Sequence, residues 1–324
     1  MSIDLAELQR MAVALGLVAL AAVPAGLGAL ALRPRGEPLL PAWRPFPVPW
    51  GGFEVTVAFV VVTFVVPITA HEVLSESGFF RWVYGDDFPH ARPDGAPAEL
   101  RAEAATLRGL WANLLALPVS LAALALARHS LYPTWRPRPN GSAAGKVALA
   151  VVAWCAVLPT VLLLNLVVNA TAQALGLPPE THALTKLGGR PVRDQVLLAA
   201  EACAGAPLRE ELLVRGLLLW WCVGRVKARG AGVAPITSIR PWLVMLFAGL
   251  LAAVGGRWQP VAFAGVLVVG FAALWRFKRT GARRARAVYA TAALFALLHP
   301  VWPNPVPLFV LGLGLGWLAA RTTG

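Results

Sequence analysis

Apolar stretches close to twenty residues long recur along the whole chain, and they constrain its fold more than any other feature. A helix of this length matches the thickness of a hydrocarbon core and satisfies its own backbone hydrogen bonds, as a segment inside a bilayer must. The sequence therefore predicts an all-α, polytopic transmembrane helical bundle with about nine spans, at 11–32, 52–71, 108–127, 147–169, 194–224, 241–256, 259–275, 287–299 and 306–320.

The composition agrees with a polytopic membrane protein. Hydrophobic residues make up 58% of the 324 residues, charged residues make up only 14%, and the mean hydropathy is +0.65. Soluble domains carry about 25% charged residues. A formal net charge of +13 could indicate nucleic-acid binding, but the basic residues occur in short clusters between apolar stretches rather than on one face. We therefore expect the lipid bilayer, and no nucleic acid, as a partner.

Neither disulfides nor a cleaved leader is expected. Cys155, Cys203 and Cys222 all lie in apolar stretches and lack Cys-x-x-Cys spacing, which argues against a disulfide framework and against a cysteine metal site. Asp4 and Glu7 precede the first apolar stretch, whereas a cleavable signal begins with positive charge. The first stretch is therefore expected to be a retained span.

The charges of the connecting loops predict the orientation. Loops 128–146, 225–240 and 276–286 carry Lys and Arg but neither Asp nor Glu, whereas loop 72–107 has seven acidic residues against three Arg. Basic loops stay in the cytoplasm. Nine spans with the N-terminus outside and the C-terminus in the cytoplasm satisfy this rule, and residues 72–107 then form an acidic external loop.

Two adjacent glutamates, Glu210 and Glu211, interrupt the apolar stretch 194–224. A carboxylate at membrane depth is costly unless it is paired or faces a polar cavity. Adjacent residues diverge by about 100° on a helix, so the two carboxylates face different directions. Glu211 and Arg215 are spaced i and i+4 and are expected to form an ion pair. Glu210 is then the candidate for a reactive carboxylate that points into the bundle.

The stretch 194–224 is longer than one membrane crossing requires. As a helix it would reach about 46 Å, against a hydrocarbon core of roughly 30 Å. It is therefore expected to tilt, to break near Pro207 or to protrude. Glu201 lies about 180° around a regular helix from Glu210 and is not expected to be its partner.

Phe295 and His299 form a second candidate group near the end of the stretch 287–299. Their spacing of i and i+4 places them on one helix face. A neutral histidine beside a carboxylate can orient or polarise a water molecule whose proton the carboxylate accepts. Glu210 and His299 are therefore the candidate catalytic pair.

These motifs resemble those of the CAAX protease and bacteriocin-processing family, which includes the type II CAAX prenyl endopeptidases. The family's first motif, Glu-Glu-x-x-x-Arg followed by Gly, matches Glu210, Glu211, Arg215 and Gly216, and its second motif, Phe-x-x-x-His, matches Phe295 and His299. The stretch that follows the second motif is also similar, with matches at Pro305 or Pro307, Phe309, Gly312, Gly316, Trp317 and Leu318. The small residues at every second position of 312–316 are expected to permit close helix contact.

The resemblance implies a glutamate-dependent intramembrane endopeptidase. Glu210 would activate the attacking water and His299 would assist it. Glu211 and Arg215 would set the electrostatics of the site, and Phe295 would support it. The expected substrate is a hydrophobic or membrane-anchored peptide, with or without a prenyl group, and the expected location is the cytoplasmic membrane of a prokaryote.

The family also has a third motif, His-x-x-x-Asn, on one further helix, and the resemblance assigns these groups to oxyanion stabilisation. The chain ends at Gly324, where that helix would begin. Residues 191–324 are thus expected to form the catalytic core without its last helix. Residues 1–190 are expected to form a variable N-terminal membrane region.

Two other functions stay open. A catalytically incomplete scaffold or immunity-type protein of the same fold would keep the buried charges without any chemistry. A proton-coupled transporter would use Glu210 and His299 as a relay, although the sequence has no inverted repeat. No cofactor is expected. Two carboxylates and a histidine could hold a divalent metal, but the commitment of Glu211 to Arg215 favours a site without one.

Overall fold

The computed structural model describes residues 5–34, 36, 48–85, 98–132, 142–176, 191–223, 239–254, 259–280, 282–299 and 305–322. These residues are almost entirely helical and include no β-strand, which confirms the predicted all-α class. They divide into two compact units, and each unit is described by itself. Part of the predicted acidic loop, with Asp86, Asp87 and Asp94, lies outside the described residues.

Among the described residues, five helical segments are long and apolar enough to cross a membrane: Gln9–Ala31, Gly52–Glu76, Arg101–Leu131, Ala143–Ala174 and Pro305–Thr322. Large apolar side chains are exposed along them, including Leu17, Leu20 and Leu27 on the first. Such surfaces are unfavourable in water and suit a lipid environment. The described parts of the predicted ranges 194–224, 241–256, 259–275 and 287–299 also lie on helices, apart from the last two residues, Leu298 and His299. The crossing of the membrane by these ranges and the orientation of the chain stay predictions.

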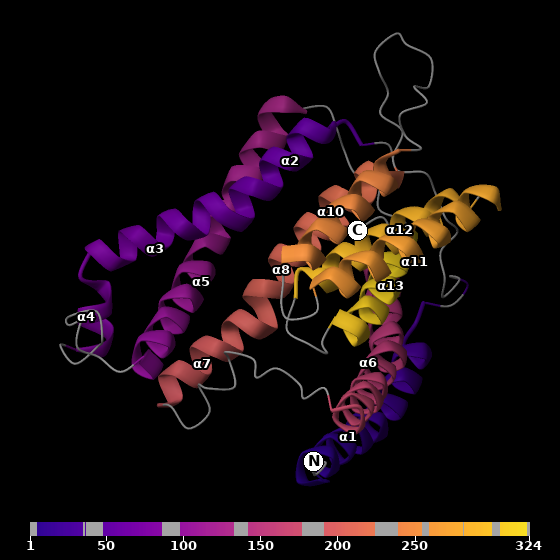
Figure 1. Cartoon of the computed structure of the whole chain (residues 1–324), viewed down its shortest axis with the longest axis horizontal. Helices are drawn as coiled ribbons and strands as arrows, with labels where there is room; N and C mark the ends of the chain where they lie inside the picture. The colour runs from indigo at the N-terminus through magenta and orange to yellow at the C-terminus, as the bar shows by residue number, and fades with distance from the viewer. Residues whose placement is uncertain are drawn as a thin grey trace. The chain divides into compact units, whose positions relative to one another are not determined.

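The first unit comprises residues 1–48, 136–180 and 214–324. Its helices are α1 (Leu5–Ala31), α6 (Ala143–Ala174), α9 (Trp220–Val223), α10 (Arg240–Val254), α11 (Gln259–Arg279), α12 (Arg283–Leu297) and α13 (Pro305–Thr322). In Figure 1, α1 and α6 lie side by side, while α12 is surrounded by α10, α11 and α13. The centre of this unit is therefore α12.

The composition of α12 explains why it can occupy the centre. All its side chains from Arg286 to Phe295 are buried except that of Tyr289, which is partly exposed. Alanine is the commonest residue of this stretch. Helices in a membrane are held together largely by close van der Waals packing, and small residues allow this close approach. Phe295 lies in the last turn of this buried helix, and His299 follows two residues after its end.

The alternating glycines of α13 permit contacts with two different helices. A Cβ atom on Gly312 would lie 3.0 Å from Ala292 Cα, and one on Gly316 would lie 3.2 Å from a Val288 methyl, both on α12. A Cβ on Gly314 would lie 3.0 Å from a Val157 methyl on α6. The prediction that these small residues permit close helix contact is confirmed.

The second unit comprises residues 49–135 and 181–213. Its helices are α2 (Gly52–Val60), α3 (Val66–Glu76), α4 (Phe79–Tyr84), α5 (Ala98–Leu131), α7 (Val192–Ala200) and α8 (Ala206–Glu210). Two π-helical segments, Val61–Val65 and Glu201–Gly205, connect α2 to α3 and α7 to α8. Within this unit α5 contacts both α3 and α7.

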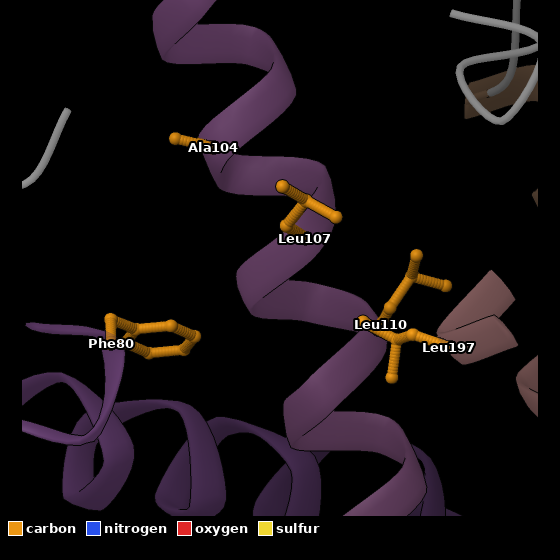
Figure 2. Close-up of a cluster of buried hydrophobic side chains, with 5 residues drawn as sticks. All are labelled: Phe80, Ala104, Leu107, Leu110 and Leu197. Atoms are coloured by element: carbon orange, nitrogen blue, oxygen red, sulfur yellow. The ribbon is translucent and has the colours of Figure 1, made fainter. Parts of the chain in front are cut away.

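Apolar side chains from three helices fill the core of the second unit. Phe80 comes from the short helix α4 and Leu197 from α7, and both approach the face of α5 that carries Ala104, Leu107 and Leu110 (Figure 2). All five are buried. Fully burying one large apolar side chain stabilises a fold by about 1.5–3 kcal/mol. This cluster holds α7 against α5 and so fixes the start of the helix that carries Glu210.

The two compact units cut the chain at different places from the predicted division between residues 190 and 191. The predicted division concerns which part of the chain carries the motifs, whereas the units are defined by internal contacts. The division at 190 therefore stays a prediction.

The ends of α2 and α5 are joined by one carboxylate. Glu54 Oε2 accepts a hydrogen bond from the Gly51 amide at 3.0 Å and caps α2. The hydroxyl of Tyr132, directly after α5, donates to Glu54 Oε1 at 3.0 Å. Burial, followed by the bond to Glu54, raises the pKa of Tyr132 to about 12.

We predict that Tyr132 ionises near pH 12 in the folded protein. Its pKa is higher when folded than in the unfolded chain, where it is about 10. Its hydrogen bond therefore contributes fully to stability below pH 10 and is lost as the pH rises towards 12. The measurement is the ultraviolet absorbance titration of the wild type minus that of Tyr132→Phe. Ionisation of Tyr132 near pH 10 would contradict the prediction.

Candidate functional site

One continuous helical segment carries the glutamate motif, and its hydrogen bonding changes along its length. After α7 and the π-helical turn Glu201–Gly205, α8 runs to Glu210, and a second π-helical stretch covers Glu211–Leu219 before α9. Pro207 has no amide hydrogen and its ring would clash with the carbonyl four residues earlier, and the first π turn lies directly before it. The helix is thus widened at Pro207 rather than interrupted there. Such π turns occur frequently at functional sites.

The clearest charge pair of this segment joins Glu201 to Arg209. Arg209 Nη2 forms an ion pair with Glu201 Oε1, and the two side chains are only 14% and 7% exposed. Arg209 Nη1 also donates to the backbone carbonyl of Asn113 on α5 at 2.7 Å. The arginine therefore satisfies a buried carboxylate and ties the segment to a neighbouring helix.

A glycine makes room for the Glu201 carboxylate. A Cβ atom on Gly205 would overlap Glu201 Oε2. Within the described part of the chain, this oxygen is buried without a hydrogen-bond partner. The Glu210 carboxylate lies within electrostatic range of Glu201. The guanidinium of Arg209 and the carboxylates of Glu201 and Glu210 therefore influence one another electrostatically.

Sequence reasoning missed this arrangement. On a regular helix Glu201 lies opposite Glu210, and Arg209 was assigned no role. The π turn Glu201–Gly205 changes the angular position of each later residue, so the 100° rule does not hold between Glu201 and Glu210. The signal that could have revealed the pair was a glutamate and an arginine on either side of a proline in an apolar stretch.

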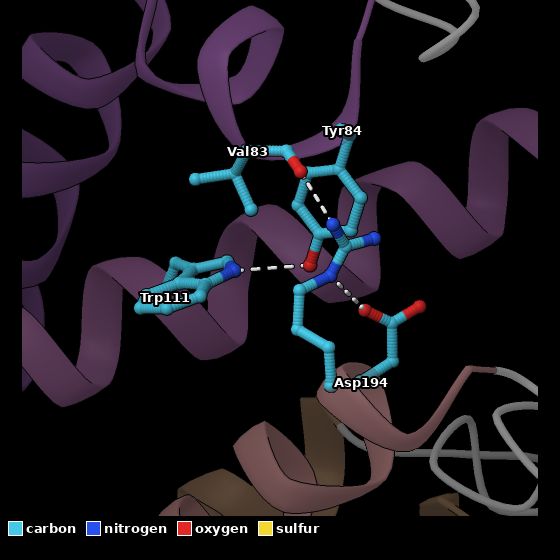
Figure 3. Close-up of polar contacts among 5 residues, drawn as sticks. Val83, Tyr84, Trp111 and Asp194 are labelled. Atoms are coloured by element: carbon cyan, nitrogen blue, oxygen red, sulfur yellow. Dashed lines mark hydrogen bonds and ion pairs between the residues drawn. The ribbon is translucent and has the colours of Figure 1, made fainter.

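An aromatic and charged cluster holds the start of the same segment. Arg193 donates to the Val83 carbonyl and, at 3.3 Å, to Asp194 Oδ1, and its guanidinium lies 3.9 Å from the centre of the Tyr84 ring. Trp111 Nε1 donates to the Tyr84 hydroxyl at 3.0 Å (Figure 3). Burial raises the pKa of Tyr84 above its ordinary value. The cluster joins α4, α5 and α7 and so positions the glutamate-bearing segment within its unit.

The arginine of the first motif contacts the phenylalanine of the second. Arg215 and Phe295 are 4% and 3% exposed, and the guanidinium lies 4.2 Å from the centre of the Phe295 ring. A desolvated cation–π contact of this kind is worth about 2 kcal/mol. Two predicted site residues that are 80 positions apart in the sequence thus lie together. Gly312 packs against the same ring, since a Cβ atom at this position would lie only 3.2 Å from Phe295 Cδ1.

His299 is oriented by the backbone of α12. Its Nδ1 lies 2.9 Å from the Phe295 carbonyl oxygen. A carbonyl oxygen only accepts, so Nδ1 is the protonated nitrogen in this bond, and in a neutral ring Nε2 then carries the lone pair. The imidazole also packs edge-on against the Phe295 ring, with centroids 5.1 Å apart. His299 therefore has a fixed tautomer and a fixed direction.

The remaining predicted site residues are partly buried. Glu210 and Glu211 belong to the second unit, whereas Arg215, Phe295 and His299 belong to the first. The ion pair of Glu211 with Arg215 and the cooperation of Glu210 with His299 stay predictions. Among the described residues, no three His, Cys, Asp or Glu side chains are grouped as a metal site would require, and the expectation of a reaction without metal also stays a prediction.

Comparisons with protein-family models, with curated proteins and with solved structures find no match to this chain. The resemblance to the CAAX protease and bacteriocin-processing family therefore depends on the motif residues alone.

We predict that Arg209 stabilises the fold chiefly by neutralising Glu201. Removing one partner of a buried ion pair costs about 3–5 kcal/mol, whereas replacing both with apolar residues is often close to neutral. Arg209→Met should therefore destabilise the protein by several kcal/mol, and Glu201→Leu combined with Arg209→Met should recover most of that loss. The measurement is denaturant-induced unfolding of the purified protein in detergent micelles.

Gly205 gives an internal control for this prediction. Gly205→Ala should destabilise the wild type, because its methyl group would displace the Glu201 carboxylate, but it should cost far less in the Glu201→Ala background. Arg101→Met, at an exposed position of α5, should change stability by no more than about 0.5 kcal/mol. If Arg209→Met and the double variant Glu201→Leu with Arg209→Met lost the same free energy of unfolding, the ion pair would be excluded as the cause.

Proposed function

We propose that the chain is an intramembrane endopeptidase of the CAAX-processing type. The observation that carries the proposal is the contact of Arg215 with Phe295. The order of the two motifs in the sequence suggested that they belong to one site, and this contact is what such a site requires. The ring also supports His299 through the next turn of the chain.

In the proposed reaction Glu210 is the general base. It accepts a proton from a water molecule as the water oxygen forms a bond to the carbonyl carbon of the scissile peptide. His299, with its lone pair on Nε2, orients that water. When the carbon–nitrogen bond breaks, the proton held by Glu210 passes to the leaving nitrogen. Glu201 and Arg209 fix the helix turn on which Glu210 lies.

The proposed substrate is a hydrophobic or membrane-anchored peptide, because the motif residues lie in apolar helices. The same proposal includes nine spans, an external N-terminus and a cytoplasmic C-terminus, in the cytoplasmic membrane of a prokaryote. The five helices of the described residues that are long and apolar enough to cross a bilayer support the membrane part of this proposal.

The central test is Glu210→Gln in the full chain reconstituted into phospholipid vesicles. A library of membrane-anchored peptides, prenylated and unmodified, is incubated with the vesicles, and the products are identified by mass spectrometry. The wild type should cleave members of the library, and Glu210→Gln should reduce the rate by about 10²–10⁴ because the proton acceptor is lost. Glu76→Gln, an exposed carboxylate at the end of α3, should retain the wild-type rate.

The outcomes separate the candidate functions. Cleavage that persists in Glu210→Gln would overturn the assignment of Glu210. A wild type that cleaves no peptide, prenylated or unmodified, would favour the scaffold protein of the same fold. In that case Arg215→Ala should still reduce stability, since it removes a buried contact with Phe295. Flux driven by a pH gradient in the same vesicles would favour the transporter.

A further inference from the structure

The excess positive charge of the chain is confined to its last third. Residues 212–324 hold 13 of the 29 Lys and Arg residues and none of the 16 Asp and Glu residues. Residues 1–211 hold 16 of each sign, so the formal net charge of +13 belongs entirely to 212–324. Residues 212–324 therefore contain no Asp or Glu side chain that could neutralise their own basic side chains.

One face of α11 passes from apolar to aromatic to basic along its last three turns. Val268, Trp275 and Arg279 are spaced by seven and four residues and so share a face. Val268 is 70% exposed and Trp275 is 50% exposed, and Arg276, Lys278 and Arg279 are exposed beyond them. Apolar residues in the hydrocarbon, tryptophan at its boundary and cations among the headgroups are the order found at a membrane interface.

The cations are gathered around the tryptophan. Lys278 Nζ lies 5.5 Å and Arg279 Cζ lies 5.3 Å from the centre of the Trp275 ring. Both distances are within the range of a cation–π contact. Two positive charges are therefore held close to an exposed aromatic ring, next to the exposed apolar residue Val268 of the same helix face.

The end of α11 is also held in a defined position. Phe277 packs against Tyr289 of α12 with ring centroids 6.0 Å apart, and Tyr289 packs edge-on against Phe309 of α13 at 5.2 Å. Cations on a fixed helix end lose less entropy on binding than cations on a flexible tail. The arrangement is therefore suited to a specific ligand.

We propose that Trp275, Arg276, Lys278 and Arg279 form a binding site for the headgroup of an anionic phospholipid. The phosphate binds the guanidinium groups and the ammonium group, and the acyl chains lie along the exposed face that carries Val268. A nucleic acid fits the charge but would leave this apolar face in water. This end of α11 is predicted to lie on the cytoplasmic side of the membrane, and anionic lipids are concentrated in the cytoplasmic leaflet.

Quenching of tryptophan fluorescence by brominated lipids tests the proposal. The full chain is reconstituted into phosphatidylcholine vesicles that contain brominated phosphatidylglycerol or, in parallel, brominated phosphatidylcholine. The signal of Trp275 is the difference between the wild type and Trp275→Phe. Phosphatidylglycerol should quench this signal several-fold more effectively than phosphatidylcholine, and the preference should decrease as salt is raised.

Two double variants show whether the preference belongs to this site. Lys278→Gln with Arg279→Gln should bring the ratio of the two quenching efficiencies close to one. Arg81→Gln with Arg101→Gln removes the same number of exposed charges from the other unit and should leave the ratio unchanged. A wild-type ratio near one, or equal losses in both double variants, would overturn the proposal. None of these outcomes depends on whether the chain cleaves peptides.

Discussion

The need to neutralise charges inside apolar helices governs this molecule more than any other constraint. A buried ionised group is tolerated only when it is paired and hydrogen-bonded. Glu201 meets this condition through Arg209, which also binds a backbone carbonyl of α5. Arg215 packs its guanidinium against the Phe295 ring. Each solution joins two segments that are far apart in the sequence, so the charges organise the packing as well as the chemistry.

Helix distortion and small residues make these contacts possible. The π turn before Pro207 and the absence of a side chain at Gly205 allow the Glu201 carboxylate to lie against its own helix. In the other unit, the alanines of α12 and the glycines of α13 bring helix backbones close together and hold Phe295 and His299 at the end of a buried helix. A reactive group gains from such support because its direction is fixed before a substrate arrives.

The sequence predicts the helices well because their main signal is local. Apolar length alone predicted helices over most of the described residues of the span ranges, and the spacing of Gly312, Gly314 and Gly316 predicted a close helix contact. The family resemblance assigned Phe295 and Arg215 to one site, but the contact between them was not predicted. The pair Glu201–Arg209 was not predicted, because the angular rule assumes a uniform helix and the π-helical turn Glu201–Gly205 breaks that rule. The division into two compact units depends on contacts between distant segments, which the pattern of one sequence does not contain.

In the proposed reaction Glu210 and His299 act on one water molecule, which requires the two side chains to meet. Cysteine cross-linking tests this most directly, in a background where Cys155, Cys203 and Cys222 are replaced by alanine. Glu210→Cys and His299→Cys are treated together with a short bifunctional thiol reagent, and cleavage of the chain between the two positions reveals whether the fragments stay joined. Phe277→Cys with Tyr289→Cys, whose rings lie 6.0 Å apart, is the positive control. If Glu210 and His299 share one site, positions 210 and 299 should be joined efficiently. Joining of the control pair but not of this pair, in folded protein, would contradict a shared site.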